Sequence, residues 1–320
     1  MARQVGCIGV GVMGRGLAQN CLKAGFEVTV FDQSSAAVEA LVAQGARAVG
    51  SPREVAAACD AIILCLPSSP HVEAVCLGPD GLIEAIQSGA VVVDCTTCSP
   101  LTSRKVAAEL KRKDAYFVDA GMTTSQRTDR RPEPSGPGIS HAVGAALGGN
   151  LLLLMGGEKE AIAKVQDVLD AISLEQRHFG DVGAGEVVKL GSNVLTAIFV
   201  AAYCEVLVWA AKQGVDAQLV VDAYRNGTAN SVVLGNHIDK FAVKRRFEPG
   251  IFPVDYMYKD VDLTLSAARA IQCPMPVTSL IFQFLESARA QGEGGTYHPV
   301  VLKVFEQLAG GVQVGRGTED

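Results

Sequence analysis

The chain has 320 residues, which is too long for one ordinary core and predicts two domains. Hydrophobic residues make up 48% and charged residues 19% of it, the composition of a globular rather than a disordered protein. The formal net charge of −6 argues against a general nucleic-acid binder, because such a protein needs a basic face to meet phosphates.

The first half of the chain alternates short apolar strands with helical stretches, which is typical of a Rossmann-type, doubly wound parallel sheet. No apolar signal-peptide region can be placed before the first strand. Ser51-Pro52 and Ser99-Pro100 each predict a helix start, with serine as the N-cap and proline at the first helical position. The strands are expected at 5–8, 27–31, 61–66, 91–94, 116–118 and 151–155.

The second half reads as helices throughout. Apolar residues recur at helical spacing from Glu186 to Gln213 and predict one long helix, whose apolar stretch 194–211 is broken by Glu205 and is expected to be buried rather than membrane-spanning. Further helices are expected at 217–225, 231–241, 255–271, 277–291 and 300–308, followed by a loose tail over 310–320. We therefore expect an NAD-binding domain over 1–182 and an all-helical substrate and dimerisation domain over 183–320.

Nine cysteines are scattered without the spacing of a disulfide framework, which favours a reduced, cytoplasmic protein. Cys95 and Cys98 form a C-x-x-C pair, for which a redox or zinc role and two small residues in a turn are the alternatives. Zinc would need a second pair or nearby histidines, and neither is present in the sequence, so no metal is expected.

A glycine-rich turn, Gly9-Val10-Gly11-Val12-Met13-Gly14, follows the first strand and opens a helix. In such a motif the first glycine allows the tight turn, the second lets the backbone approach a pyrophosphate, and the third lets helix pack on strand. The helix N-terminus then offers free amide donors to the phosphates. The second strand ends at Asp32, whose carboxylate would accept hydrogen bonds from the adenosine ribose and repel a 2′-phosphate. The pattern predicts NAD as the cofactor; a turn-forming role before Ser34 is the alternative for Asp32.

Two more strand ends, at Leu66-Pro67 and at Asp94 to Pro100, belong to the same edge of the sheet, where ligands of such folds bind.

In the long helix that follows the sheet, Lys189 and Asn193 are four residues apart and therefore project from one face. A lysine inside an apolar helix is costly unless it has a role or a partner, and burial lowers a lysine's pKa toward the range that suits proton transfer. The alternative is a lysine that reaches solvent from the first turns of the helix.

Taken together, these motifs resemble the β-hydroxyacid dehydrogenase family, which includes 3-hydroxyisobutyrate dehydrogenase and tartronate semialdehyde reductase. The resemblance rests on G-x-G-x-M-G at the start, D-x-T-T-x-x-P from Asp94, Gly156-Gly157, G-x-G-x-x-x-K ending at Lys189, and the late pair Lys259-Asp260. It covers nearly the whole chain in the right order, and it implies an NAD-dependent dehydrogenase or reductase of a small 3-hydroxy acid or 2-hydroxy-3-oxo acid.

The resemblance also implies the roles of particular residues. Lys189 would be the catalytic lysine, acting as general acid and base, and Asn193 would orient the substrate beside it. Lys259 would close over the cofactor, although a surface charge is the alternative for it taken alone. The nicotinamide-side positions would be Leu66, Pro67, His71 and Thr97, and a helix-start residue is the alternative for His71 taken alone.

Two departures from the family's pattern concern the substrate. Ser192 stands where the family usually has asparagine three residues after the lysine. The family's loop D-x-P-V-S-G-G here continues from Asp119 as Ala-Gly-Met and then Thr123, Thr124 and Ser125, so that hydroxyl side chains replace the paired glycines. We expect these three residues to bind the acid group of the substrate. The following run 126–138 is longer than usual and carries Arg127, Arg130 and Arg131, which form either a mobile flap or an idle insertion.

Three readings of the chain compete. An imine reductase-like oxidoreductase would share the fold and cofactor but generally lacks the lysine at this place. A catalytically silent dinucleotide-binding sensor would not need Lys189, Asn193, Thr97 and Lys259 together. The hydroxy-acid dehydrogenase accounts for all of them, and it is expected to form a homodimer or homotetramer through its apolar helical half, with no nucleic-acid or membrane partner.

Overall fold

The computed structural model describes residues 3–127, 131–133, 141–249 and 251–315. The chain forms two compact units, Met1–Lys189 and Leu190–Asp320, and the division between them falls inside the long helix α9 (Ala184–Lys212). Each unit is described by itself.

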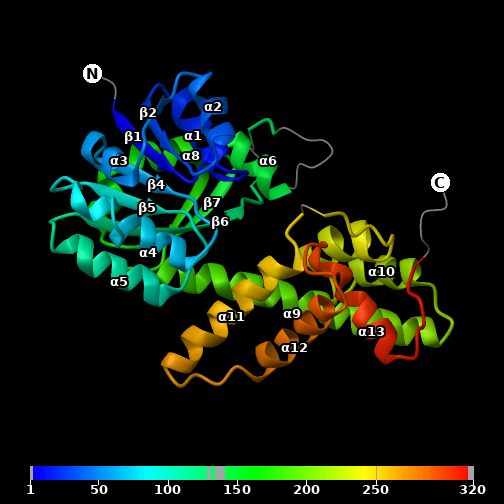
Figure 1. The fold of residues 1–320 in the computed structure, drawn as a ribbon. Helices are drawn as coiled ribbons and strands as arrows, with labels where there is room; N and C mark the ends of the chain where they lie inside the picture. Colours follow the sequence, from blue (N-terminus) through cyan, green and yellow to red (C-terminus); the bar gives the residue numbers. More distant parts are fainter. Residues whose placement is uncertain (1–2, 128–130, 134–140, 250, 316–320) are drawn as a thin grey trace. The chain divides into compact units, whose positions relative to one another are not determined.

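The first unit is built on an eight-stranded sheet with the order β3-β2-β1-β4-β5-β6-β7-β8 (Figure 1). All neighbouring strands are parallel except β6 and β7, which are antiparallel. The strand order reverses between β1 and β4, which is where doubly wound sheets bind their ligands. The strands are β1 Gln4–Ile8, β2 Glu27–Phe31, β3 Arg47–Ala48, β4 Ala61–Leu64, β5 Val91–Asp94, β6 Tyr116–Thr124, β7 Leu151–Gly156 and β8 Ser173–His178.

Helices cover both faces of this sheet, because the central strands are apolar on both sides. Val5 and Cys7 of β1, for example, pack with α1, α6 and α8, whereas Ile8 packs with α3, α4 and α5. The helices are α1 Gly14–Lys23, α2 Ser35–Val42, α3 Pro52–Ala58, α4 Ser69–Leu77, the 3₁₀ turn η1 Leu82–Glu84, α5 Pro100–Lys111, α6 His141–Gly148, α7 Lys159–Lys164 and α8 Gln166–Ile172. The predicted α/β fold is confirmed, and the Ser51 side chain caps α3 as expected.

The second unit is helical. The apolar residues of α9 form much of its core, including Val194, Val200, Cys204 and Leu207. By length and composition alone α9 could cross a membrane, with a mean hydropathy of 2.0 in its apolar stretch, but a core helix passes the same test. The other elements are α10 Ala217–Arg225, the π-helix η2 Leu234–Ala242, α11 Val254–Ala270, α12 Pro276–Ala290, the 3₁₀ turn η3 His298–Val301 and α13 Leu302–Leu308.

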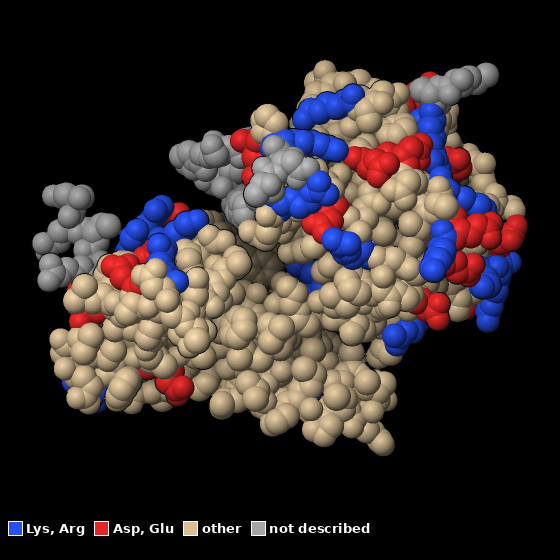
Figure 2. All heavy atoms as spheres, turned by 180° about the vertical axis from the view of Figure 1, so that it is seen from behind, with Lys and Arg blue, Asp and Glu red and all other residues tan. Residues whose placement is uncertain are grey.

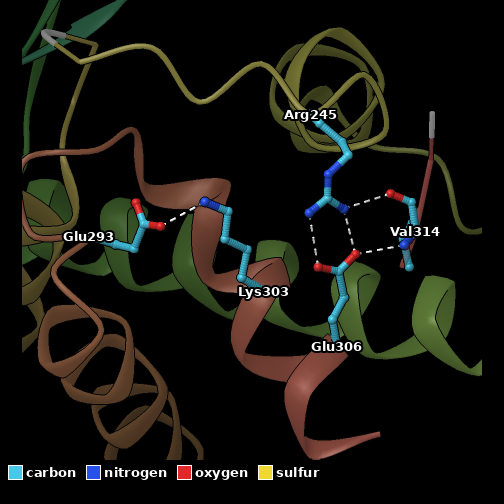
Figure 3. A network of polar contacts seen from close by, with 5 residues as sticks. All are labelled: Arg245, Glu293, Lys303, Glu306 and Val314. Carbon is cyan, nitrogen blue, oxygen red and sulfur yellow. Dashed lines mark hydrogen bonds and ion pairs between the residues drawn. The ribbon is translucent and has the colours of Figure 1, made fainter. Parts of the chain in front are cut away.

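The predicted loose tail is wrong for residues 310–315. Glu306 of α13 is nearly buried, forms an ion pair with Arg245 and accepts a 2.6 Å hydrogen bond from the N–H of Val314 (Figure 3). Arg245 in turn donates to the Val314 carbonyl oxygen, and the Val314 side chain is fully buried. These contacts hold the segment after α13 against the second unit.

Four further elements differ from the prediction. Strand β6 extends six residues beyond the expected 116–118, because its second half pairs with β7 instead of turning away from the sheet. The edge strands β3 and β8 were not predicted, since β8 reads Ser-Leu-Glu-Gln-Arg-His and shows no apolar run. The helix expected at 231–241 is a π-helix over Leu234–Ala242.

Candidate functional site

The glycine-rich turn after β1 has the geometry of a pyrophosphate cradle. Gly9 has a φ of +81°, and a Cβ on Gly14 would lie 1.9 Å from the carbonyl oxygen of Gly9, so neither position admits a side chain. A Cβ on Gly11 would meet nothing within 4 Å, which leaves open space above the backbone. The first and third glycines therefore serve the packing of β1 and α1, and the second leaves room for a ligand.

Helix α1 begins in this turn without a side-chain cap. Met13 occupies the N-cap position, no side chain accepts a hydrogen bond there, and the first turn has no acidic residue. The first amides of a helix need acceptors, and the helix dipole favours an anion beside them. The residues present thus fit the diphosphate of a dinucleotide.

Asp32 lies at the end of β2, beside this turn. Its Oδ2 accepts a 2.7 Å hydrogen bond from the N–H of Val10, and its Oδ1 accepts a 2.8 Å bond from the N–H of Ser34. Both the ribose-binding hypothesis and the turn-forming alternative agree with this geometry. The bond to Val10 adds that the carboxylate is fixed directly to the glycine-rich turn.

The loops that follow β4 and β5 are bonded to each other. The N–H of Leu66 donates to Thr96 Oγ1 at 2.9 Å, and the N–H of Ser99 donates to Ser69 Oγ at the same distance. Thr97 is half-buried between these contacts, whereas Pro67 and His71 are exposed. The ring of His71 bonds the Ser68 hydroxyl at the start of α4, which also agrees with its helix-start alternative.

One carboxylate, Asp119 of β6, fixes the start of α9. It accepts a 2.6 Å hydrogen bond from the N–H of Gly183 and a 2.9 Å bond from the N–H of Glu186. The helix approaches so closely that a Cβ on Gly156 or on Gly185 would lie within 2.9 Å of an Asp119 oxygen. Asp119 thus provides the acceptors that the first amides of α9 need.

Lys189, in the second turn of α9, lies directly on β6. A Cβ on Gly121 would be 2.6 Å from Cβ of Lys189, so glycine is required there for the lysine to sit so close. Side chains alternate along a strand, and Asp119 and Gly121 both face α9. Thr123 is the next residue on the same face, and it is half-buried. The structure therefore brings Lys189 and Thr123 to one face of the sheet.

The other two hydroxyl residues of the substrate loop lie elsewhere. By the same alternation Thr124 points to the opposite face, where Ala120 and Met122 pack with α1 and α6. Ser125 is fully buried, and its hydroxyl donates a 3.2 Å hydrogen bond to Glu175 of β8.

The insertion after this strand is partly described. The Arg131 side chain donates to the carbonyl oxygens of Asp170 and Ala171 at the end of α8, and its N–H donates to Asn150. Arg131 thus ties the insertion to the first unit. Arg130 lies outside the described residues.

In the second unit, Asn193 and Lys259 share one buried partner, Asp260. Asn193 Nδ2 donates to Asp260 Oδ2 at 2.5 Å, and Lys259 Nζ forms a 3.1 Å ion pair with Oδ1. Asp260 is 1% exposed, so this carboxylate orients both groups from inside the core. Sequence analysis did not assign it a role, although the Lys259-Asp260 pair was noted as a motif.

A second feature that the sequence did not reveal is a group of three buried carboxyls beneath the start of α9, Asp94, Asp119 and Glu186. Burial raises the pKa of Asp94 to about 7 and raises the pKa of Asp119 and of Glu186 above their ordinary values. The thiol of Cys98 donates to Asp94 within this group, and burial raises its pKa too. Cys98 is therefore a buried thiol rather than a reactive one.

Comparisons with known proteins agree with this geometry. Residues 4–133 match the family model of the NAD-binding domain of 6-phosphogluconate dehydrogenase. Residues 183–305 match a second one, described as the NAD-binding domain of NADP-dependent 3-hydroxyisobutyrate dehydrogenase.

Individual relatives are similar over almost the whole chain. It is 34% identical to 2-(hydroxymethyl)glutarate dehydrogenase of Eubacterium barkeri, with 96% of each protein covered. It is 32% identical to 3-hydroxyisobutyrate dehydrogenase of Pseudomonas aeruginosa, covering 90% of this chain and 93% of the relative. A crystal structure of 3-hydroxyisobutyrate dehydrogenase from Salmonella typhimurium matches 94% of this chain and 99% of its own, with 27% identity and a TM-score of 0.77. The chain is thus an oxidoreductase that acts on CH–OH groups with NAD as cofactor, and it belongs to the β-hydroxyacid dehydrogenase family.

Proposed function

We propose that this protein transfers a hydride between NAD and a small 3-hydroxy acid or 2-hydroxy-3-oxo acid, with Lys189 as the general acid and base. The observation that carries the proposal is the close contact of the Lys189 side chain with Gly121, which lies on the same sheet face as Thr123. A half-buried lysine on the same sheet face as a hydroxyl side chain suits a substrate with an alcohol and a carboxylate close together.

The proposed reaction requires a group that transfers the hydroxyl proton and a donor that binds the substrate carboxylate. NAD, when bound, supplies the hydride acceptor for the carbinol carbon. Lys189, in its neutral form, accepts the proton of the substrate hydroxyl; in reduction its ammonium returns that proton to the forming alkoxide. Thr123 donates its hydroxyl hydrogen to the substrate carboxylate, which needs a donor once water is excluded.

Asn193 and Lys259 complete the proposal from the second unit. Asn193 is one helical turn beyond Lys189, so both project from the same face of α9. Asp260 accepts a hydrogen bond from the Asn193 amide nitrogen and so orients this side chain, which we assign to positioning the substrate beside Lys189. Lys259 keeps its assignment as the residue that closes over the cofactor.

The first prediction concerns cofactor choice. The carboxylate of Asp32 is held at the glycine-rich turn, where it would repel a 2′-phosphate. NAD should therefore be preferred over NADP, and Asp32→Asn or Asp32→Ser should narrow the difference in kcat/KM between them. Equal or better turnover of the unchanged protein with NADP would contradict this role of Asp32.

The second prediction concerns Lys189. Lys189→Ala should lower kcat by about 10²–10⁴-fold, the usual contribution of a positioned acid–base group. NAD affinity, measured by calorimetry, should stay near its original value, because the phosphates and the ribose are held by the glycine-rich turn and Asp32. The assay is NAD reduction at 340 nm against a panel of 3-hydroxy acids. Preference for cyclic amines would favour the imine reductase, no turnover at all would favour the sensor, and full turnover of Lys189→Ala would refute the mechanism.

The third prediction concerns the altered substrate loop. Thr123→Val should lower kcat/KM by about 10- to 100-fold, since a hydrogen bond to a charged group is worth roughly 1.5–3 kcal/mol. Thr124→Val is the matched control on the opposite strand face and should cause a much smaller loss. An Arg127/Arg130/Arg131 triple alanine variant should change kcat/KM by only a few-fold. If the triple variant lost more than Thr123→Val, the insertion and not the strand would bind the acid group.

The fourth prediction concerns assembly. We propose a homodimer or homotetramer joined through the second unit, in which α9 leaves Leu195, Phe199 and Trp209 more than 40% exposed. Figure 2 shows a wide area of the surface without charged side chains, as such an interface needs. Light scattering at micromolar concentration should give two or four times the chain mass of 33.5 kDa; a monomer would contradict the proposal.

We also propose a reducing, cytoplasmic environment for this protein, which its nine free cysteines support.

A further inference from the structure

Glu186 is the most unusual side chain in the first turn of α9. It is fully buried, three residues before Lys189 on the same helix. Its Oε2 accepts a 3.2 Å hydrogen bond from the N–H of Cys98, a residue 88 positions away in the loop after β5. Its Oε1 is equally buried and bonds to none of the described residues.

That single hydrogen bond connects two parts of the proposed site. Cys98 directly follows Thr97, which is assigned to the nicotinamide side, and Glu186 directly precedes the helical turn that carries Lys189. Other contacts hold each part separately, since Asp119 binds the start of α9 and Asp94 binds the N–H of Thr96. The Glu186 carboxyl thus links the first turn of α9 to the Cys98 amide.

We propose that Glu186 is a positioning residue that fixes the loop of Thr97 relative to the turn of Lys189. This inference rests on the proposed role of Lys189 and deepens it. Proton transfer to a lysine and hydride transfer to a nicotinamide occur on the same substrate, so an error of about 1 Å between their positions costs rate.

The surroundings of Glu186 explain why its neutral form serves this purpose. The charged and titratable groups that face it are Asp94 on β5, Cys95 and Cys98 in the loop, Asp119 on β6 and Lys189 on its own helix. Burial, and then the two aspartates, raise the pKa of Glu186 well above its ordinary value. An ionised Glu186 would instead favour the ammonium form of Lys189, which cannot accept a proton.

Replacing Glu186 by glutamine or by leucine distinguishes a positioning role, which needs only a hydrogen-bond acceptor, from a role that needs the charged carboxylate. Glu186→Gln keeps a neutral carbonyl acceptor for the Cys98 amide, and it should retain kcat within about 2-fold and leave the pH profile of kcat unmoved. Glu186→Leu removes the acceptor at similar volume, and it should lower kcat by roughly 10-fold or more. Glu205→Leu, on an exposed position of the same helix, is the matched control and should behave like the unchanged protein.

The hydrogen bond between Glu186 and the Cys98 amide can also be tested without measuring turnover. Hydrogen–deuterium exchange of the peptide containing Cys98, followed by mass spectrometry, should stay slow in Glu186→Gln and become faster in Glu186→Leu. Unchanged exchange in Glu186→Leu, or an acid shift of the pH profile in Glu186→Gln, would overturn the proposal. The acid shift would mean that Glu186 is the anionic partner of Lys189.

Failure of the proposed function would look different. In that case Lys189→Ala would keep its turnover, while the exchange measurement would still report on the bond between Glu186 and Cys98. If Glu186 acts through Lys189, Glu186→Leu should add little further loss in a Lys189→Ala background. Full additivity of the two losses would also overturn the positioning role.

Discussion

The carboxylate of Asp119 is the contact on which the arrangement of the first unit depends. It lies in the middle of β6, at the point where the parallel part of the sheet ends and the antiparallel pairing with β7 begins. It accepts from two backbone amides at the start of α9, and so compensates both their lost hydrogen bonds and the positive end of the helix dipole. This one side chain therefore fixes the first turn of α9 to the sheet.

Close packing of the start of α9 on β6 then confines Lys189, the residue that we propose for proton transfer. At positions 121, 156 and 185 glycine allows the start of the helix and the strands to approach more closely than a Cβ would permit. With the helix so close, the stem of Lys189 is confined against β6, and its amine is carried by a side chain with few remaining conformations. A lysine held in this way loses less freedom on meeting a substrate than one on an exposed helix, which is the physical basis of preorganisation.

The apolar strands and the long helix were predictable because burial on both faces leaves a direct trace in the sequence. Strand β8 was not predictable, since this edge strand carries the partly buried Glu175 and the exposed Arg177 and shows no apolar run. Among the site residues, the glycine-rich turn, Asp32 and Lys189 could be proposed from local motifs. Asp260 and Glu186 could not be assigned, because their roles arise from partners that are 67 and 88 residues away.

The substrate loop shows most clearly what the structure adds to a motif. In the sequence Thr123, Thr124 and Ser125 are equivalent, three neighbouring hydroxyl residues in place of a serine and two glycines. Pairing of β6 with β7 makes them unequal, because a strand sends successive side chains to opposite faces. Thr123 lies on the strand face of Gly121, which contacts Lys189, and Thr124 lies on the opposite face with Ala120 and Met122. The Ser125 hydroxyl is bonded to Glu175. The extension of β6 by six residues therefore gives the three candidate donors different surroundings, and on this ground the proposal assigns the substrate carboxylate to Thr123.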